Sequence, residues 1–215
     1  MTVESSSPEA LARDIVQGLT EGRFTAGQRL SERELIERYG VGRSTVREAL
    51  SRLSVAGVAE FIPHRGAAIR RMTRREAESI LRVASSLLSL LARQAAEAVA
   101  AGADPAEVKA AYLTLSQTKG PERQNARTRY YRALLSLAGN DELRRLLPQI
   151  QLPLLRAQLG MNFGFAPNGQ APVVEAICKG DPEAAAAAAM AHVAYPLTAL
   201  PSLPDSLFAP SGPRG

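Results

Sequence analysis

The segment LSERELIERYGVGRSTVREALSRLSVAG, residues 30–57, decides the fold of the first part of this chain. Ser31 followed by Glu34 has the spacing of a capping box, in which the serine hydroxyl accepts from the third helical amide and the glutamate accepts from the serine amide. We therefore predict that a helix begins at Ser31. We predict that it ends at Gly40, because glycine readily adopts the left-handed conformation that terminates many helices.

A second helix is predicted after the turn Gly40-Val41-Gly42. Its apolar residues recur at i, i+4 and i+7, which places them in one buried stripe; they are Val46, Leu50 and Leu53. Polar and basic side chains gather near its N-terminal end on another side, namely Arg43, Ser44 and Arg47. The buried stripe holds the helix and leaves the basic end free.

The flanking segments extend this pair of helices. Ser7 and Pro8 have the N-cap and N1 pattern of a helix start, and Leu11, Ile15 and Leu19 give that helix an apolar side. Residues 23–30 lack helical periodicity, and we predict a loop there. The β-prone runs 58–62 and 67–70, separated by a Pro/Gly turn, predict a hairpin. Helix, helix-turn-helix and hairpin together predict a winged helix-turn-helix domain over residues 1–72.

Positive charge is concentrated in this first domain. The 215-residue chain has a formal net charge of +5, and residues 38–71 alone carry seven arginines against two acids. The predicted hairpin tip is small and basic, and consists of His64, Arg65 and Gly66. A concentrated positive field is what binding to a polyanion requires, since neutralised phosphates release counterions. The clustering favours double-stranded DNA as a partner.

The remainder of the sequence predicts helices. Residues 76–101 carry apolar side chains at helical spacing, namely Ile80, Val83, Leu87, Leu90 and Leu91. Further helices are expected over 105–117, 121–137, 141–160 with breaks at Pro148 and Pro153, 172–178 and 182–195. We predict a mainly α protein with an all-α bundle of six to seven helices over residues 73–197. The proline-rich residues 198–215 are expected to form a flexible tail.

Composition excludes several classes of protein. Hydrophobic residues make up 46% of the chain and charged residues 22%, as in ordinary globular proteins. The sequence has neither a membrane-length apolar run nor a secretory leader, so we expect a cytoplasmic protein without a membrane partner. With two histidines and a single cysteine, it offers neither a disulfide nor a catalytic constellation. We do not expect an enzyme.

Two stretches resemble a known family. LSERELIERYGVGRSTVREALSRLSVAGVAEFIPHRGAAI, residues 30–69, resembles the winged helix-turn-helix of GntR-family transcription regulators. YYRALLSLAGNDELRRLL, residues 130–147, and AICKGDPEAAAAAAMAHV, residues 176–193, resemble the FCD ligand-sensing domain of the FadR subfamily. The resemblance implies a transcription regulator, usually a repressor, that binds a palindromic operator as a homodimer and responds to a small molecule.

The resemblance also implies a set of DNA-contacting positions, which are Arg33, Arg43, Ser44, Arg47, His64, Arg65 and Gly66. An arginine near the start of a recognition helix can donate two parallel hydrogen bonds to guanine, so Arg47 is the candidate base reader. Arg43 is expected on a base or a phosphate, and Ser44 and Thr45 suit a phosphate at the helix N-terminus. The competing interpretation is that these arginines are solvated or paired with Glu34 or Glu48.

The helical half departs from its family at the metal site. Many FCD domains bind a divalent metal through one aspartate and three histidines. By the resemblance, these four positions correspond to Arg127, Tyr131, Gln170 and His192, so one histidine remains. Zinc and its neighbours require about three or four N, O or S ligands. We therefore expect neither a metal nor another cofactor.

A charge argument suggests what replaces the metal. Arg127 and Tyr131 are four residues apart and share a helix face; with Gln170 and His192 they could bind a carboxylate, such as an organic acid. The alternative is that the cavity is filled, with Tyr131 and His192 in the core. The chain would then be a constitutive DNA-binding regulator with a degenerate, effector-free helical domain. In the first case, the signal must pass through residues 73–75 and the long helix after them.

Overall fold

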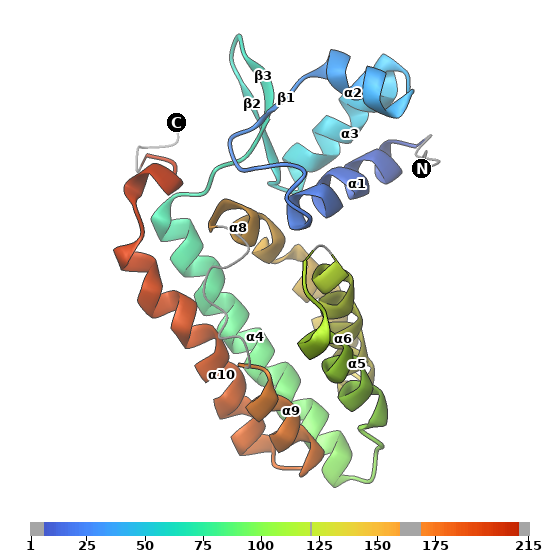
Figure 1. The fold of residues 1–215 in the computed structure, drawn as a ribbon, viewed down its shortest axis with the longest axis vertical. Helices are drawn as coiled ribbons and strands as arrows, with labels where there is room; N and C mark the ends of the chain where they lie inside the picture. The colour runs from blue at the N-terminus through green and yellow to red at the C-terminus, as the bar shows by residue number, and fades with distance from the viewer. Residues whose placement is uncertain (1–6, 121, 160–168, 211–215) are drawn as a thin grey trace. The chain divides into compact units, whose positions relative to one another are not determined.

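A computed structural model describes residues 7–120, 122–159 and 169–210. These residues form two compact units (Figure 1). The first unit consists of residues 7–73 together with 153–159 and 205–210, and the second consists of residues 74–120, 122–152 and 169–204. Each unit is considered by itself.

Three helices and a small sheet build the first unit. The helices are α1 (Pro8–Thr20), α2 (Glu32–Tyr39) and α3 (Arg43–Val55). Ser7 caps α1 and Ser31 caps α2 through their hydroxyls, as the sequence predicts. Gly40 adopts φ +65° after α2, in the left-handed region that few side chains tolerate. The stripe predicted on α3 is buried, with Val46, Leu50 and Leu53 at most 2% exposed.

The sheet contains β1 (Arg29–Leu30), β2 (Ala59–Ile62) and β3 (Gly66–Ile69), in the order β1-β3-β2 and antiparallel throughout. The hairpin prediction is confirmed. The prediction of a loop over residues 23–30 is wrong at its end, because Arg29 and Leu30 pair with Ala68 and Ala67 of β3. A two-residue strand leaves no periodicity to detect, but it ties the segment before α2 to the hairpin.

Segments from the second half of the chain complete the first unit. Helix α8 (Leu152–Leu159) supplies Gln158, and a short 3-10 helix, η3 (Asp205–Leu207), precedes Phe208, which is 6% exposed. The side chain of Gln158 accepts from the amide of Met72 at 2.7 Å and donates to the carbonyls of Met72 and Leu207, both at 2.9 Å. The prediction that the first domain ends at residue 72 and contains nothing beyond it therefore differs from the packing.

The prediction of a flexible tail from residue 198 is also wrong up to residue 210. Helix α10 (Pro182–Ala199) continues past Pro196, and a 3-10 turn, η2 (Leu200–Ser202), buries Leu200. The amide of Ala209 donates to the carbonyl of Met72 at 3.0 Å. These apolar and backbone contacts order a segment that its proline content alone does not predict.

The second unit is a helical bundle built around α4 (Arg74–Ala100), which runs alongside α10 (Figure 1). Its remaining helices are α5 (Ala106–Gln117), α6 (Glu122–Ala138), α7 (Asp141–Leu146), η1 (Leu147–Gln149) and α9 (Ala171–Cys178). The expected break at Pro148 is present, since η1 separates α7 from α8, whereas Pro153 lies within the first turn of α8 and does not break it. The predicted fold class, mainly α with a small β wing, is confirmed. No helix within the described residues is long and apolar enough to span a membrane.

The buried face of α4 differs from the predicted one. Of the predicted stripe, Leu91 is fully buried, whereas Val83 is 52% and Leu90 39% exposed. The buried face instead carries alanines and leucines, which are Ala77, Leu81, Ala84, Leu88, Leu91, Ala92, Ala95 and Ala96. It faces the alanine tract of α10, where Ala185, Ala186 and Ala189 are buried. Small side chains on both helices allow close approach, which outweighs the larger apolar residues on the neighbouring face.

Candidate nucleic-acid interface and effector cavity

The N-terminal end of α3 presents unpartnered polar groups. Gly42 occupies the N-cap and provides no side-chain cap, so the first amides of α3 have no side-chain partner from their own N-cap residue. Arg43 and Ser44 are exposed, and Thr45 is half-buried. Within the described residues, the guanidinium of Arg43 forms neither a hydrogen bond nor an ion pair. This end of the helix can therefore accept an anion through amides, hydroxyls and guanidinium groups.

Arg47 lies one turn further along α3 and is paired. Its Nε donates to both carboxylate oxygens of Glu32, at 3.0 and 3.1 Å. The competing interpretation named Glu34 and Glu48 as partners of such arginines. The structure instead pairs Glu48 with Arg52, at 2.8 Å. Arg47 stays 65% exposed despite its pair.

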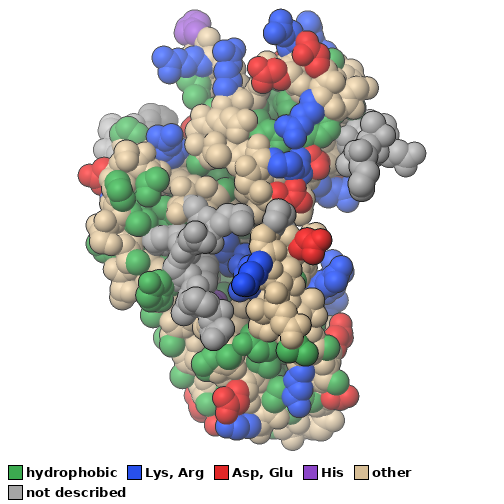
Figure 2. Space-filling view, viewed as in Figure 1, with side chains coloured by type: hydrophobic (Ala, Val, Ile, Leu, Met, Phe, Trp, Pro, Cys, Tyr) green, Lys and Arg blue, Asp and Glu red, His purple; other side chains and the backbone are tan. Residues whose placement is uncertain are grey.

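Arg33 and the wing provide the other predicted contacts. Arg33 is 84% exposed and lies 3.7 Å from Glu37 on the same helix. At the tip of the β2–β3 hairpin, the side chains of His64 and Arg65 are exposed, and His64 and Gly66 adopt φ +61° and +80°. Basic side chains, all of them arginines, lie on the hairpin and over α2 and α3 together with acidic side chains (Figure 2). The predicted DNA-contacting residues thus lie on two exposed elements of the same unit, the α2–α3 pair and the hairpin.

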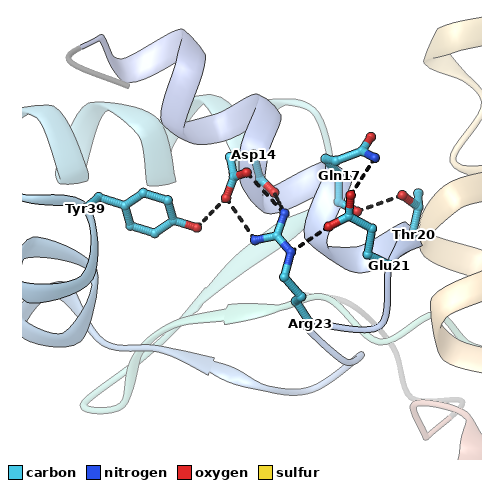
Figure 3. A network of polar contacts seen from close by, with 6 residues as sticks. All are labelled: Asp14, Gln17, Thr20, Glu21, Arg23 and Tyr39. Carbon is cyan, nitrogen blue, oxygen red and sulfur yellow. Dashed lines mark hydrogen bonds and ion pairs between the residues drawn. The ribbon is translucent and has the colours of Figure 1, made fainter. Parts of the chain in front are cut away.

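A polar network holds α1, α2 and the segment between them together (Figure 3). Arg23 donates to both carboxylate oxygens of Asp14, at 3.0 and 3.1 Å, and through Nε to Glu21 at 2.6 Å. The hydroxyl of Tyr39, at the end of α2, donates to Asp14 at 2.6 Å. Asp14 on α1 therefore connects to both neighbouring segments. The network fixes the first helix of the helix-turn-helix against α1.

The electrostatic consequences follow from these contacts. Burial opposes ionisation of Asp14, but hydrogen bonds from Arg23 and Tyr39 and the charges of Arg23 and Arg38 outweigh it, so the pKa of Asp14 is lowered. Burial and then the hydrogen bond to Asp14 raise the pKa of Tyr39 to about 12. At neutral pH, Asp14 is thus ionised and accepts hydrogen bonds, and Tyr39 is neutral and donates one.

The second unit contains a small cavity at the predicted effector position. Tyr131 of α6, Gln170 before α9 and His192 of α10 all line it, so three of the four predicted residues lie together. The rest of the lining is mainly apolar and comprises Leu88, Leu91, Ala92, Tyr130, Leu134, Val173 and Ala189. The cavity measures about 20 Å³, and one water molecule requires about 10–15 Å³. It is large enough for a water molecule and too small for a metabolite.

Arg127 is not brought to this cavity. It is absent from the lining, and its Nη1 donates to the side-chain oxygen of Gln124 at 2.9 Å. The donor set around the cavity is one imidazole, one amide and phenol groups, which do not fit a divalent metal. Within the described ranges, no group of three histidine, cysteine, aspartate or glutamate side chains could hold one.

Comparison with known proteins agrees with the arrangement of the first unit. Residues 8–69 match the model of the bacterial regulatory proteins of the gntR family. The match runs from the start of α1 to the end of β3. The first unit is therefore similar to the regulatory proteins of this family.

Relatives and solved structures extend the similarity over most of the chain. A probable D-xylose utilization operon transcriptional repressor of Paenarthrobacter nicotinovorans is 28% identical over 193 residues, covering 86% of this chain and 84% of its own. A transcriptional regulator GntR from Rhodococcus sp. RHA1 has the same fold, with a TM-score of 0.74, 20% identity and coverage of 91% and 97%. E. coli McbR/YncC has a TM-score of 0.72 at 18% identity, with the same coverage.

Three polar residues with structural contacts could not be picked out from the sequence. Glu32 contacts Arg47 although 15 positions separate them, and Gln158 contacts Met72 across 86 positions. Arg23 was read only as part of a loop. Each has an ordinary local sequence, so the only available signal was a polar residue within an otherwise apolar pattern, as at Gln158 in LPLLRAQL.

Proposed function

We propose that this regulator binds a palindromic operator as a homodimer and acts as a repressor in the cytoplasm. One observation carries the proposal. The N-terminal end of α3 and the hairpin tip present exposed basic groups on one unit, while the opposite side of α3 is buried. Recognition helices related by a two-fold axis match two half-sites about one helical turn apart.

Each exposed group has a role in this proposal. Arg47 reads a guanine, and Arg43 contacts a base or a phosphate. Ser44, Thr45 and the uncapped amides of α3 bind a backbone phosphate. Arg33 contacts a second phosphate. His64, Arg65 and Gly66 enter the groove beside α3, where a small tip permits close approach.

Selection of bound fragments from genomic DNA by the full-length protein tests the operator. We expect enrichment of one palindromic motif, and a two-to-one ratio of protein to duplex by analytical ultracentrifugation. Arg47→Ala should abolish enrichment of the motif, whereas the matched change Arg13→Ala, on the exposed side of α1, should preserve it. Fragments with no common motif, or a motif without two-fold symmetry, would contradict the proposal.

We further propose that the second unit is an FCD-type domain of the FadR subfamily that senses a small molecule. Tyr131, Gln170 and His192 supply polar groups to its cavity, and Arg127, one turn before Tyr131, is the cation that an organic acid would recruit. The signal reaches the first unit through residues 73–75 and α4. Because the Paenarthrobacter relative is named for D-xylose utilization, a neutral sugar is a second ligand class to be tested.

A constitutive regulator without an effector is the second candidate. The size of the cavity, about 20 Å³, and the engagement of Arg127 by Gln124 favour it. Under this proposal, Tyr131 and His192 are core residues and the bundle serves dimerisation alone. A sensor must instead open the cavity when its ligand binds, and the affinity of the ligand is then reduced by the cost of opening.

Thermal unfolding of the full chain against organic acids and pentoses, D-xylose included, separates the two. A sensor responds to one compound with a concentration-dependent rise in the unfolding midpoint. If that compound is an acid, Arg127→Ala should remove the response, and Arg129→Ala on the exposed side of α6 should keep it. An Arg127→Ala protein with unchanged affinity would rule out the proposed role of Arg127. No response across both panels, with operator binding intact, supports the constitutive regulator.

A further inference from the structure

The ion pair between Arg47 and Glu32 constrains how Arg47 can approach DNA. Glu32 is the first residue of α2, and both its carboxylate oxygens accept from Arg47 Nε, at 3.0 and 3.1 Å. In the part of the chain that the structure describes, the terminal nitrogens Nη1 and Nη2 of Arg47 have no hydrogen-bond partner. Nε, with one of the five N–H donors of the guanidinium, is therefore bound by the protein, and the four donors of Nη1 and Nη2 remain.

This division selects one mode of guanine recognition. A guanidinium can offer a base either Nε with one terminal nitrogen or both terminal nitrogens, because its donors form a rigid planar fork. Glu32 occupies Nε, so the pair Nη1 and Nη2 remains for guanine O6 and N7. A side chain held at Nε also loses fewer rotamers when it binds, so more of the contact energy appears as discrimination between bases.

The other arginines of the interface lack this arrangement. Arg33 lies 3.7 Å from Glu37 of the same helix and is 84% exposed, so its pair constrains it little. Arg43 has no partner among the residues described. These two side chains can follow a phosphate wherever it lies, whereas Arg47 is held across two helices. The ion pair with Glu32 thus distinguishes Arg47 from Arg33 and Arg43.

The carboxylate of Glu32 also acts on the DNA backbone. A negative charge at the start of α2 repels phosphates and cancels part of the charge of Arg47, which weakens binding to any sequence. The helix dipole favours a carboxylate at this first-turn position. We propose, on the basis of the operator binding proposed above, that Glu32 is a positioning residue that orients Arg47 for one guanine per half-site and lowers affinity for non-specific DNA.

Three variants separate these effects in the full-length protein. Glu32→Gln removes both the charge and the strong acceptor. Glu32→Asp keeps the charge but is too short to reach Nε without movement of the helices. Glu37→Gln is the matched control, since it removes an equal charge from the same helix and leaves Arg47 untouched. Dissociation constants are measured on the selected operator, on every single-base-pair variant of a half-site and on a non-specific duplex, over a range of salt concentrations.

We expect the wild-type protein to discriminate about 5- to 150-fold at the base pair read by Arg47. Glu32→Gln should lose most of that discrimination and bind non-specific DNA more tightly. Glu32→Asp should lose the discrimination without the gain in non-specific affinity. Glu37→Gln should bind non-specific DNA more tightly and keep the discrimination. Unfolding midpoints of all three variants should match the wild type, because these carboxylates are exposed or half-buried on the surface.

Arg47→Lys identifies the base pair, since lysine keeps the charge but cannot donate a bidentate pair. If Glu32 acts through Arg47, Glu32→Gln adds no further loss of discrimination in the Arg47→Lys background. The proposal is overturned if Glu32→Gln keeps the wild-type discrimination, or loses it at a base pair that Arg47→Lys leaves unaffected. A wild-type protein that selects no motif would instead refute operator binding itself, which is a different outcome.

Discussion

Two of the guanidinium–carboxylate sites in the first unit, at Arg23 and Arg47, have opposite character. Arg23 directs Nε, Nη1 and Nη2 to acceptors on Asp14 and Glu21, and Asp14 also accepts from Tyr39 (Figure 3). Arg47 directs only Nε to Glu32. The side chain of Arg23 is 32% exposed and that of Arg47 65%.

Arg23 and Arg47 are the same residue type, and they differ in how many of their nitrogens donate to groups of the protein. Arg23 makes four hydrogen bonds and uses all three of its nitrogens, which leaves little for a ligand, and its contacts contribute to stability. A guanidinium held by one nitrogen is oriented but still has donors available. The same distinction separates Gln158, which is buried and hydrogen-bonded to the backbone of Met72 and Leu207, from the exposed polar groups around α3. It predicts which substitutions lower stability and which change only DNA binding.

Gln158→Ala should give the largest loss of stability. It leaves the amide of Met72 and the carbonyl of Leu207 without the side-chain partner, in a region where Gln158 is 7% and Met72 0% exposed. Unsatisfied buried groups and lost hydrogen bonds together should cost about 2 to 4 kcal/mol. Denaturant unfolding of the full chain measures this. Gln149→Ala, an exposed glutamine in η1, is the control and should change little; equal effects would refute the assignment.

Asp14→Asn should destabilise the first unit by about 1 to 2 kcal/mol at neutral pH, because it removes the negative charge paired with Arg23 and replaces one of the two acceptor oxygens by an NH2 donor. The pKa of Asp14 is lowered in the folded state, so its contribution is complete above the unfolded pKa of about 3.9 and is lost as pH falls through the folded pKa. The difference in unfolding free energy between wild type and variant should therefore shrink below about pH 4.

A control for this pH dependence is Asp141→Asn. Asp141 is 91% exposed and paired at 3.7 Å with Arg144. The difference in unfolding free energy between the wild type and Asp141→Asn should be small at all pH values. A wild-type minus Asp14→Asn difference that stays constant from neutral to acidic pH would show that the charge of Asp14 is not what stabilises the network.

Elements whose conformation depends on residues close in the sequence could be predicted. Ser31, Glu34 and Gly40 determine their own conformations through neighbours within a few positions, so the helix-turn-helix was predictable. The wing was predictable from its turn residues. The two-residue β1 was not, because its only signal is pairing with β3, almost forty positions away.

Contacts between residues far apart in the sequence could not be predicted. The buried face of α4 depends on the alanine tract of α10, and alanine carries little weight in a pattern of apolar residues although it permits close approach. Glu32 with Arg47, and Gln158 with Met72, are pairs that only the folded chain brings together. The effector position was predicted for Tyr131, Gln170 and His192, which line one cavity, but Arg127 lies elsewhere because helical spacing does not fix the direction of a long side chain.

Tyr39→Phe should have a smaller effect than Asp14→Asn, of about 1 kcal/mol. The substitution removes one donor to Asp14, at 2.6 Å, and keeps the ring against Arg38, whose guanidinium lies 5.7 Å from the ring centroid. Denaturant unfolding measures the loss. In the double variant Tyr39→Phe/Asp14→Asn, the two losses should not add, since they share one hydrogen bond. Simple additivity would place Tyr39 outside the network.

Arg33→Ala should have the smallest effect on stability and a clear effect on DNA binding. Its side chain is 84% exposed and lies 3.7 Å from Glu37, and exposed pairs of this kind contribute little. The unfolding midpoint should therefore stay at the wild-type value. If Arg33 contacts a phosphate, the slope of log binding constant against log salt should fall by about 1, equally for operator and non-specific DNA. A lowered midpoint would place Arg33 with Arg23 among the structural arginines, and an unchanged slope with an unchanged midpoint would remove it from the interface. The two measurements thus test directly whether an unsaturated guanidinium on α2 serves binding rather than folding.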